Sequence, residues 1–305
     1  MKFWIDTDIG GDIDDALALL LAMSYDDIEI VGVSTVFENT VARAKIAKKL
    51  LEMGNKPHVK VYAGIGQPFK ATTVHNHRVD LVSYPKTYIP SLFDDVQIED
   101  LGAIEALKQA LEENDDLVVI TLGALTNIAY LINSHPETAA KIKKLYIMGT
   151  AIWLNLNEFN ISCDPEAADI VLNAPIPKAV ISLDVTFKCQ LNNEQIETLK
   201  QCDSELVKTV IAMNELWGEG MILHDPLTLS EAINENFVTY EPGNLKVELE
   251  GSYSRGKVIN LMDFNWGRKP NPFLHISTAV KNEQFTEFFV KKIYYLNKRL
   301  LDDNI

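Results

Sequence analysis

Cysteine is scarce in this chain, with three residues, Cys163, Cys189 and Cys202, among 305. So small and odd a number excludes a disulfide framework, and we expect free thiols in a reducing compartment. Basic residues are also few, since 28 Lys and Arg stand against 43 Asp and Glu, for a net charge of −15. Such a surface repels phosphate backbones and anionic lipids. Nucleic acid is therefore not an expected partner.

Long apolar runs are absent too. No stretch approaches the ~20 apolar residues that span a bilayer, and the first residues reach Asp6 without the apolar core of a signal peptide. We therefore expect a cytoplasmic protein that does not contact membranes. The sequence also lacks internal repeats, low-complexity tracts and Pro/Gly linkers. A single domain over residues 1–305 is the simplest organisation.

The sequence does contain short β-rich runs that alternate with helical patterns. This alternation predicts an open, mostly parallel twisted α/β sheet flanked by helices. Strands are expected at 2–6, 29–36, 59–63, 117–122, 144–148 and 179–183, then at 245–250 and 258–262. Helices are expected at 14–23, 40–53, 100–113, 124–133, 165–172, 193–201, 204–217, 226–233 and 283–300. Two long loops, 67–92 and 150–164, are expected to be functional.

An acidic cluster follows the first expected strand. Five carboxylates fall within ten residues: Asp6, Asp8, Asp12, Asp14 and Asp15. Such a charge density is unfavourable without a cation, and hard cations such as Ca²⁺ take ~6 to 8 oxygen ligands. Gly10 and Gly11 allow the tight backbone that would bring these side chains together. The alternative is a solvated acidic turn in which one or two aspartates cap the next helix.

Two other metal motifs were compared with this segment. An EF-hand loop starting at Asp6 fails, because Gly10 and Leu17 stand where oxygen ligands are required. A Mg²⁺-dependent phosphatase of the haloacid dehalogenase type also opens with a strand and Asp-x-Asp. Gly10 replaces its usual Thr or Val, which weakens this hypothesis, with Asp6 as nucleophile, without eliminating it.

Polar residues also follow the other strands. Glu38 and Asn39 follow the second, Leu122 and Gly123 the fourth, and the loop with Glu158 and Asn160 the fifth. Ligands of open α/β sheets bind at the carboxyl ends of the strands. Because no Lys or Arg accompanies these residues, they suit a neutral polyhydroxylated ligand such as a sugar better than a phosphate. Alternatively, Asn39 and Asn160 only cap the neighbouring helices.

His224, Asp225 and Pro226 open a later helix, with Pro226 as its first residue. Asp225 is either an N-cap or a metal ligand. His224 beside a metal-competent carboxylate favours a role in proton transfer, since imidazole titrates near neutral pH.

Five segments together carry a resemblance: DTDIGGDIDDALAL, VSTVFEN, TLGALTNIA, NEFNISCDPEAA and LHDPL. In this order the chain resembles, over nearly its whole length, the nucleoside hydrolase family of inosine–uridine-preferring nucleoside N-ribohydrolases. The resemblance implies an open α/β fold, a bound Ca²⁺, and hydrolysis of the N-glycosidic bond of ribonucleosides to free base and ribose. It also implies a homodimer or a homotetramer.

Residue roles are carried over from the same resemblance. The implied calcium ligands are Asp8, Asp15, Asp225 and the main-chain carbonyl of Leu122. The implied ribose-binding residues are Asp14, Asn39, Glu158 and Asn160, with Asn155 as a further candidate and Met148 lining the sugar site. Asp8 would take a proton from the attacking water, and His224 would protonate the leaving base. Trp153, Trp217 and Trp266 are alternative partners that would stack on the base.

Three departures from the family pattern leave alternatives open. Asp8 lies six residues before Asp14, two more than usual, so Asp12 is a second candidate for its role. The shorter loop after residue 149 makes Asn155 and Asn157 competing ribose ligands. The segment with His75, His77 and Arg78 lacks the usual His-Gly stretch, so the base preference stays undetermined. A non-catalytic calcium-dependent nucleoside or sugar binder is the third hypothesis.

Overall fold

A single large sheet organises the molecule. The computed structural model describes residues 1–70, 73–74, 77–262 and 268–303. Eight strands lie in the order β3-β2-β1-β6-β7-β8-β12-β9, and within this sheet only the pairing of β12 with β9 is antiparallel. The prediction of an open, mostly parallel α/β sheet is confirmed. The strands are β1 (Lys2–Thr7), β2 (Glu29–Thr35), β3 (Val61–Ala63), β4 (Thr73–Val74), β5 (His77–Arg78), β6 (Val118–Thr121), β7 (Lys144–Met148), β8 (Lys178–Ile181), β9 (Val238–Pro242), β10 (Leu245–Val247), β11 (Val258–Asn260) and β12 (Leu274–Val280).

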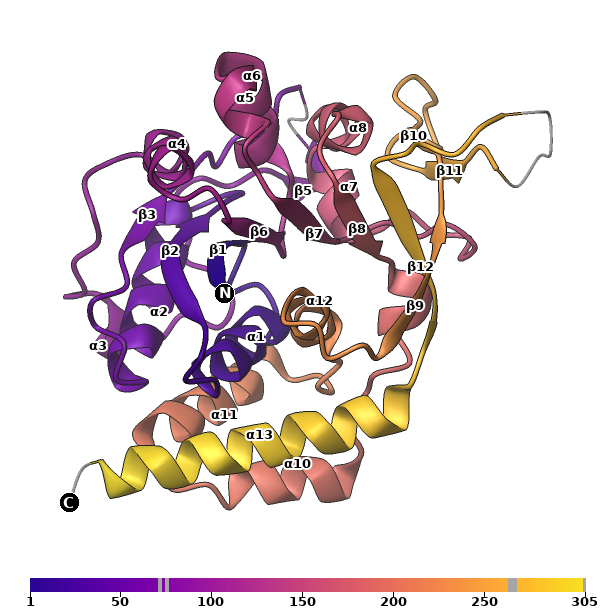
Figure 1. Cartoon of the computed structure of the whole chain (residues 1–305). Coiled ribbons are helices and arrows are strands. Elements are labelled where there is room, and N and C mark those ends of the chain that lie inside the picture. The colour runs from indigo at the N-terminus through magenta and orange to yellow at the C-terminus, as the bar shows by residue number, and fades with distance from the viewer. Residues whose placement is uncertain (71–72, 75–76, 263–267, 304–305) are drawn as a thin grey trace.

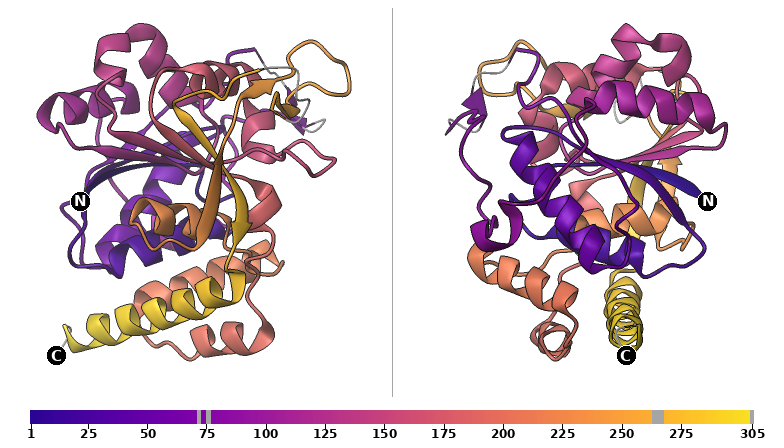
Figure 2. Two further views of the ribbon diagram at one scale, coloured as in Figure 1. Left: turned by 45° about the vertical axis from the view of Figure 1, so that its right-hand side comes forward. Right: turned by 90° about the vertical axis from the view of Figure 1, so that its left-hand side faces the viewer.

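Helices cover both faces of this sheet. Figure 1 shows α4, α5, α6 and α8 on one face, and α1, α2 and α12, with α10, α11 and α13 beyond them, on the other; the views in Figure 2 agree. The helices are α1 (Asp14–Met23), α2 (Thr40–Met53), α3 (Pro90–Phe93), α4 (Ala103–Glu113), α5 (Thr126–Ser134), α6 (Pro136–Ala139), α7 (Phe159–Cys163), α8 (Pro165–Asn173), α9 (Leu183–Thr186), α10 (Asn193–Lys200), α11 (Glu205–Trp217), α12 (His224–Ala232) and α13 (Asn282–Asp302).

β1 lies inside the sheet and is buried on both faces. Phe3 and Ile5 join the hydrophobic cluster on the side of α1, while Trp4 joins the cluster on the opposite side. Alternation of side chains between the two faces explains this division, and parallel strands covered on both faces are apolar throughout. β1 therefore delivers the residues that follow it to the rim of the sheet from a rigid position.

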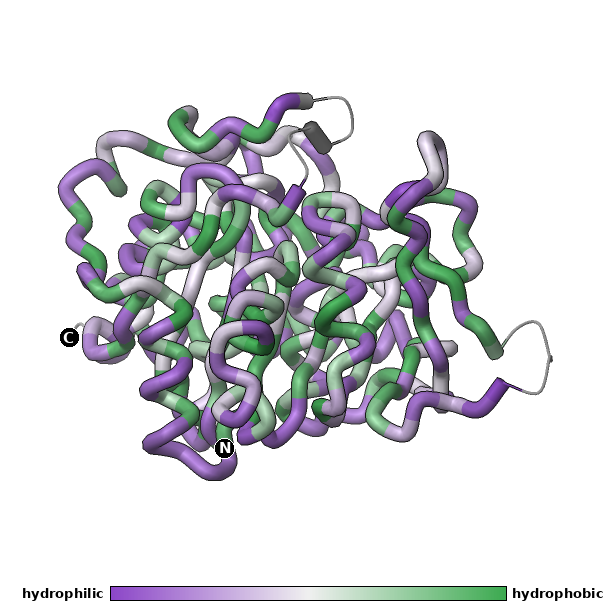
Figure 3. The backbone as a smooth tube through the Cα atoms, turned by 90° about the horizontal axis from the view of Figure 1, so that it is seen from above, coloured by the Kyte–Doolittle hydropathy of each residue, from purple (hydrophilic) through white to green (hydrophobic). Residues whose placement is uncertain are grey.

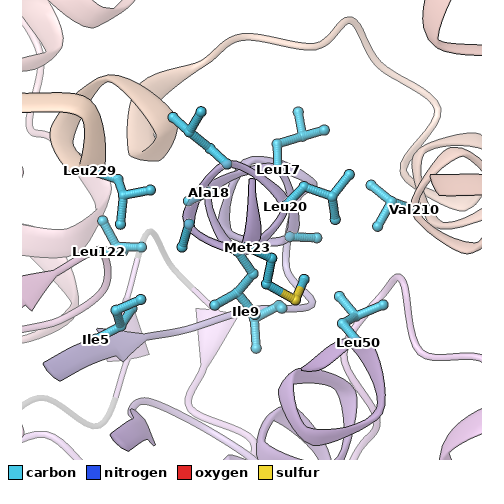
Figure 4. Packing of buried hydrophobic residues seen from close by; sticks show 14 of the residues in the cluster. Ile5, Ile9, Leu17, Ala18, Leu20, Met23, Leu50, Leu122, Val210 and Leu229 are labelled. Atoms are coloured by element: carbon cyan, nitrogen blue, oxygen red, sulfur yellow. The ribbon is translucent and has the colours of Figure 1, made fainter. Parts of the chain in front are cut away.

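Helix α1 is buried on every side. All ten of its residues are buried, and Figure 4 shows Leu17, Ala18 and Leu20 pointing in different directions, toward residues of several neighbouring elements. A helix that is apolar around its whole circumference belongs in the core of an α/β protein. α12 packs beside α1. The first turns of both helices meet at the rim where β1 ends.

Two strands of the main sheet were not predicted from the sequence. β12 and β9 extend it beyond β8, whereas the strands expected at 245–250 and 258–262 form the separate β10–β11 pair. β9 is an edge strand whose residues are half-buried or exposed, so its sequence carries no continuous apolar run. Helix α12 begins at His224, two residues earlier than expected, with Leu223 as its N-cap. The N-cap interpretation of Asp225 is therefore wrong.

The outer helices, the cysteines and the hydropathy of the helices complete the description of the fold. Figure 3 shows hydrophilic and hydrophobic stretches alternating along the outer helices, as expected where one side of a helix faces the core. Cys163, Cys189 and Cys202 are free and buried, as expected. Among the described residues, none of the helices combines the length and the hydropathy that a membrane span requires.

Candidate active site

A cavity of about 800 Å³ opens at the edge of the sheet where β1, β2, β6 and β7 end. Its wall is strongly acidic, and Arg43 is the only Lys or Arg among the described lining residues. The acidic lining residues are Asp8, Asp12, Asp14, Asp15, Glu38, Glu158 and Asp225. The other lining residues are Gly11, Arg43, Leu122, Met148, Leu156, Asn157, Phe159, Asn160, Leu183, Phe187, Trp217 and His224.

The acidic side chains at the first turns of α1 and α12 are buried against each other. Asp14, Asp15 and Asp225 are 6%, 2% and 2% exposed. Burial, and then repulsion by neighbouring carboxylates, raises the pKa of Asp8, Asp14 and Asp225 well above its usual value. The same causes raise the pKa of Asp15 to about 7. The cluster therefore needs either protons or a cation to offset its charge.

The donor set suits a hard divalent cation. Carboxylate oxygens of Asp12, Asp14 and Asp15 lie within 4.8 Å of one another, and the backbone N–H of Asp225 donates to Asp14 Oδ2 at 3.3 Å. All available ligands are oxygens, as hard cations prefer. The four expected metal ligands, Asp8, Asp15, Leu122 and Asp225, line this one cavity. Asp12 lines it as well, so both residues that could act as the general base and first metal ligand, Asp8 and Asp12, lie in this cavity.

Two glycines allow the acidic loop to approach its neighbours. Gly10 has a φ of +108°, a conformation that other residues rarely adopt. A Cβ atom at Gly123 would lie 2.9 Å from Cβ and Cγ of Asp8. Asp8 can therefore occupy its place only because residue 123 has no side chain.

Arg43, which was not predicted as a site residue, contacts both the loop after β1 and the turn after β2. Its Nη1 donates to the carbonyls of Asp8 and, at 3.1 Å, Ile9, while Nε donates to the carbonyl of Phe37 at 2.8 Å. Nη2 lies 3.3 Å from Glu38 Oε2, and the Arg43 side chain is 4% exposed. One sequence feature could have identified it: the helix that begins directly after the rim residues Glu38 and Asn39 carries an arginine in its first turn.

We expect Arg43→Met to lower the free energy of unfolding by about 2 to 3 kcal/mol, because three buried carbonyls and one carboxylate lose their donors. Urea denaturation followed by far-UV circular dichroism measures this change. Lys49→Met on the same helix is the matched control, expected to stay within about 0.5 kcal/mol of the parent. Equal stabilities for the two variants would contradict the role given to Arg43.

The turn between β2 and α2 is strained. Phe37 and Glu38 have φ angles of +65° and +58°, left-handed values that cost non-glycine residues of order 1 kcal/mol or more and cluster at functional sites. This turn directs Glu38 into the cavity. Asn39 does not line it, because its Oδ1 accepts from the N–H of Ala42 at 3.1 Å and caps α2. The helix-cap interpretation of Asn39 is confirmed.

Glu158 and Asn160 enter the cavity from the short helix α7. Glu158 caps this helix, and its carboxylate accepts the N–H groups of Thr150, Asn160 and Ile161 at 3.1, 2.8 and 3.0 Å. Asn160 is not a cap, so that interpretation is wrong. Its Nδ2 donates to the carbonyl of Leu122 at 2.8 Å. The amide of Asn160 thus contacts the carbonyl that was expected to hold the metal.

The preceding loop separates the two competing asparagines. Asn157 lines the cavity, whereas Asn155 is exposed and is not among the lining residues. Met148, at the end of β7, lines the cavity and is 4% exposed. The structure therefore brings Asn157, not Asn155, to the other predicted site residues.

His224 lies on the far side of the acidic cluster, among aromatic rings. Its Nδ1 is 2.7 Å from Thr186 Oγ1, and its ring meets Phe187 edge-on at 5.4 Å. Burial lowers the pKa of His224 to about 4, and the nearby Asp12 carboxylate works in the opposite direction. Thr186 was missed, since nothing in the local sequence links it to a histidine 38 positions away.

The tryptophans named from the sequence differ in position. Trp217 lines the cavity, and Lys86 Nζ lies 4.2 Å from the centroid of its ring. Trp153 is 50% exposed and is not among the lining residues. Trp266 and His75 lie outside the described residues. His77 and Arg78 form the short strand β5.

Asp6, the nucleophile of the phosphatase hypothesis, does not reach the cavity. It is fully buried and accepts hydrogen bonds from Ser34 Oγ and Asn127 Nδ2. A nucleophile must contact its substrate. The structure therefore gives no support to a phosphatase that uses Asp6.

Comparisons with known proteins agree with the resemblance. A family model described as "Inosine-uridine preferring nucleoside hydrolase" matches residues 3–287. The pyrimidine-specific ribonucleoside hydrolases RihA of Klebsiella pneumoniae (strain 342) and Salmonella agona are each 30% identical, over 97% and 95% of this chain and 99% and 97% of their own lengths.

Solved structures show the same fold. A purine-preferring ribonucleoside hydrolase from Gardnerella vaginalis has a TM-score of 0.81 at 25% identity and covers 98% of this chain and 100% of its own. A plant nucleoside hydrolase has a TM-score of 0.83 at 24% identity, with coverages of 96% and 98%. With its acidic cavity at the carboxyl ends of the strands, this chain belongs to the inosine–uridine-preferring nucleoside hydrolase family and is a hydrolase of N-glycosyl bonds.

Proposed function

We propose that the chain hydrolyses ribonucleosides to free nucleobase and ribose in a Ca²⁺-dependent reaction, as a single catalytic domain over residues 1–305. One observation carries the proposal: buried carboxylates from the first turns of α1 and α12 line the same cavity as Asp8 and His224. The cavity unites a cation-binding cluster with groups that transfer protons. Asp8, Asp15, Asp225 and the Leu122 carbonyl are the proposed protein ligands of calcium.

The ribose would lie between the acidic cluster and the wall formed by α7. When bound, Ca²⁺ would coordinate the vicinal 2′ and 3′ hydroxyls and would lower the pKa of the attacking water. Asp14, Glu158 and Asn160 would orient the sugar, with Met148 against its apolar side. Asn157 takes the place of Asn155 in this proposal because it lines the cavity. Asn39, which caps α2, would act indirectly by holding the β2–α2 turn.

The residues of this chain divide the chemistry between two sides of the sugar. The water oxygen attacks C1′ while Asp8 accepts a proton from that water. At the same time the bond between C1′ and the base breaks. The sugar then resembles an oxocarbenium ion, and the surrounding carboxylates stabilise its positive charge. His224 gives a proton to the departing base, a step worth about 10² to 10⁴ in rate. Because burial lowers its pKa, the imidazole has to gain that proton within the site, a state that the Asp12 carboxylate favours.

The base would occupy the aromatic end of the cavity, beside Phe187, Trp217 and His224. Aromatic rings stack on any nucleobase, so this end alone selects no single base. The similar proteins include a pyrimidine-specific and a purine-preferring hydrolase. We propose a role in nucleoside salvage in the cytoplasm, as a homodimer or homotetramer, on the strength of the family resemblance.

The direct test is an assay of reducing sugar released from uridine, cytidine, inosine and adenosine. We expect at least one of them to be hydrolysed with a kcat of ~1 s⁻¹ or more. Chelation of calcium should reduce the rate to background, and excess Ca²⁺ should restore it, because the acidic cluster then regains its counter-charge.

Two results would speak against the proposal. Folded, calcium-loaded protein that hydrolyses none of the four nucleosides would contradict it. Calorimetric binding of a nucleoside without release of ribose would instead select the non-catalytic binder.

A further inference from the structure

The backbone of residues 151–156 is held by two side chains of opposite charge from distant parts of the chain. These residues precede Asn157 and Glu158, and Leu156 itself lines the cavity. They contain no helix or strand. A segment of this kind is usually mobile unless its backbone polar groups find partners.

Asp184 binds the N–H groups of the loop. Its Oδ2 accepts from Ile152 at 2.8 Å, and its Oδ1 accepts from Trp153 at 3.0 Å and Leu154 at 2.8 Å. Three successive amides that converge on one carboxylate form a well-defined anion site. Asp184 belongs to the single turn α9, which also carries Thr186, the partner of His224.

Lys257 binds the carbonyls of the same loop. Its Nζ donates to Ala151 at 3.0 Å, Leu154 at 2.6 Å and Leu156 at 3.2 Å, which uses all three ammonium protons. Lys257 immediately precedes β11. The antiparallel strands β10 and β11 form a hairpin, and Arg255 and Lys257 lie in its connection. Asn157 Nδ2, one residue beyond the loop, donates to the carbonyl of Arg255 at 2.9 Å.

The hairpin that carries Lys257 is itself anchored. Arg255 Nη2 lies 2.7 and 2.6 Å from the two carboxylate oxygens of Glu166, on α8. A charge-assisted contact of this kind is both strong and geometrically specific. Lys257 therefore reaches the loop from a fixed platform.

The position of the loop indicates which part of a nucleoside it meets. In the proposed function, the acidic cluster takes the 2′ and 3′ hydroxyls and the aromatic end takes the base. The remaining substituent of the ribose is the 5′-hydroxymethyl group. Of the lining residues outside those two regions, Leu156, Asn157 and Glu158 end or directly follow residues 151–156, and we assign the 5′ end to the wall that they form. The backbone of this wall is what Asp184 and Lys257 hold.

We propose that Lys257 and Asp184 are positioning residues for substrate binding: by clamping residues 151–156 they hold the wall that receives the 5′ end of the ribose. The inference rests on the proposed function for the identity of the ligand. Neither side chain touches the substrate. Their contribution is to keep the wall ordered before the nucleoside arrives, which saves the cost of ordering it on binding.

The test compares Lys257→Met and Asp184→Asn with the parent, using whichever nucleoside is hydrolysed and its 5′-deoxy counterpart. For the nucleoside we expect KM to rise about tenfold and kcat to stay within about threefold, the pattern of lost substrate binding. For the 5′-deoxynucleoside, which cannot use the wall fully, the same substitutions should raise KM less than about twofold. Lys257→Arg keeps the charge but replaces the compact ammonium with a planar fork, so its KM should lie between those of Lys257→Met and the parent.

Lys246→Met is the matched control. Lys246 lies on β10, where its Nζ donates to Asn173 Oδ1 on the surface at 2.5 Å, and among the described residues no hydrogen bond from it to residues 151–156 is found. The KM of Lys246→Met should match that of the parent. Hydrogen exchange supplies a second readout: amides 152–154 should exchange at least about tenfold faster in Asp184→Asn, while the urea midpoint stays unchanged.

The outcomes separate the two proposals. Parent protein that hydrolyses no nucleoside would count against the proposed function. An active parent whose variants keep both its KM and its amide exchange would overturn the clamp alone. KM values that rise equally for the 5′-deoxynucleoside would overturn the assignment of the wall to the 5′ end.

Discussion

Asp8→Asn is expected to reduce kcat about 10⁴-fold with the fold intact, because the substitution removes both the proposed general base and a proposed calcium ligand. Steady-state hydrolysis at saturating Ca²⁺ and nucleoside measures the loss. Calorimetry should show weaker Ca²⁺ binding in the same variant. Asp8 is held at the cavity by the close approach of Gly123 and by the Arg43 contact to its carbonyl, so the side-chain change leaves the loop in place.

Asp12→Asn is the matched control, since Asp12 lines the same cavity from the same loop. We expect it to reduce kcat about tenfold or less, through the loss of one nearby negative charge. A collapse of activity in Asp12→Asn beside an active Asp8→Asn would reverse the two roles.

Stability gives an independent readout for Asp8. Burial and its neighbours raise the pKa of this carboxyl in the folded protein. A carboxyl whose pKa is higher in the folded state binds its proton more tightly there, so the free energy of unfolding falls as pH rises from the unfolded-state pKa through the folded-state pKa. Calcium-free Asp8→Asn should therefore have a higher Tm than the calcium-free parent at pH 7. The same substitution thus stabilises the metal-free protein and removes the activity.

His224→Ala is the second large effect, an expected loss of about 10³-fold in kcat on natural nucleosides. The reason is that a departing base needs a proton, whereas p-nitrophenolate does not. Hydrolysis of p-nitrophenyl riboside by the same variant should therefore stay within about tenfold of the parent. The ratio of the two rates isolates the leaving-group step from any general damage to the site.

Thr186→Val provides the graded control for His224. It removes the hydroxyl that lies 2.7 Å from Nδ1 but keeps the imidazole, so we expect a loss of about tenfold on nucleosides. A His224→Ala variant that loses activity equally on both substrates would show that the imidazole does not protonate the base.

The central part of the fold was predictable because local pattern and burial agree there. The expected bounds of α1, α2 and β7 are those of the structure. β12 and β9 were missed because their stability comes from pairing with β8 and with each other rather than from an apolar run of their own. Edge strands carry the weakest sequence signal, since one of their sides faces solvent.

The site could be predicted where a residue contributes its side chain and follows a strand. Asp8, Asp15, Glu158 and Asn160 all line the cavity. Asn39 shows the limit, since a residue in the right place on the chain turned its side chain to the helix behind it. The positions of Arg43 and Lys257 depend on backbone carbonyls of other segments, which no sequence pattern displays.

The pairing of the first turns of α1 and α12 has a consequence for biosynthesis. Asp14 and Asp225 meet although 211 positions separate them. A ribosome must therefore complete most of the 305 residues before both parts of the acidic cluster exist. A nascent chain that stops short of α12 would contain Asp8, Asp14 and Asp15 but not Asp225, so the proposed ion site would be incomplete. Binding of the proposed ion should accordingly be among the last events of maturation.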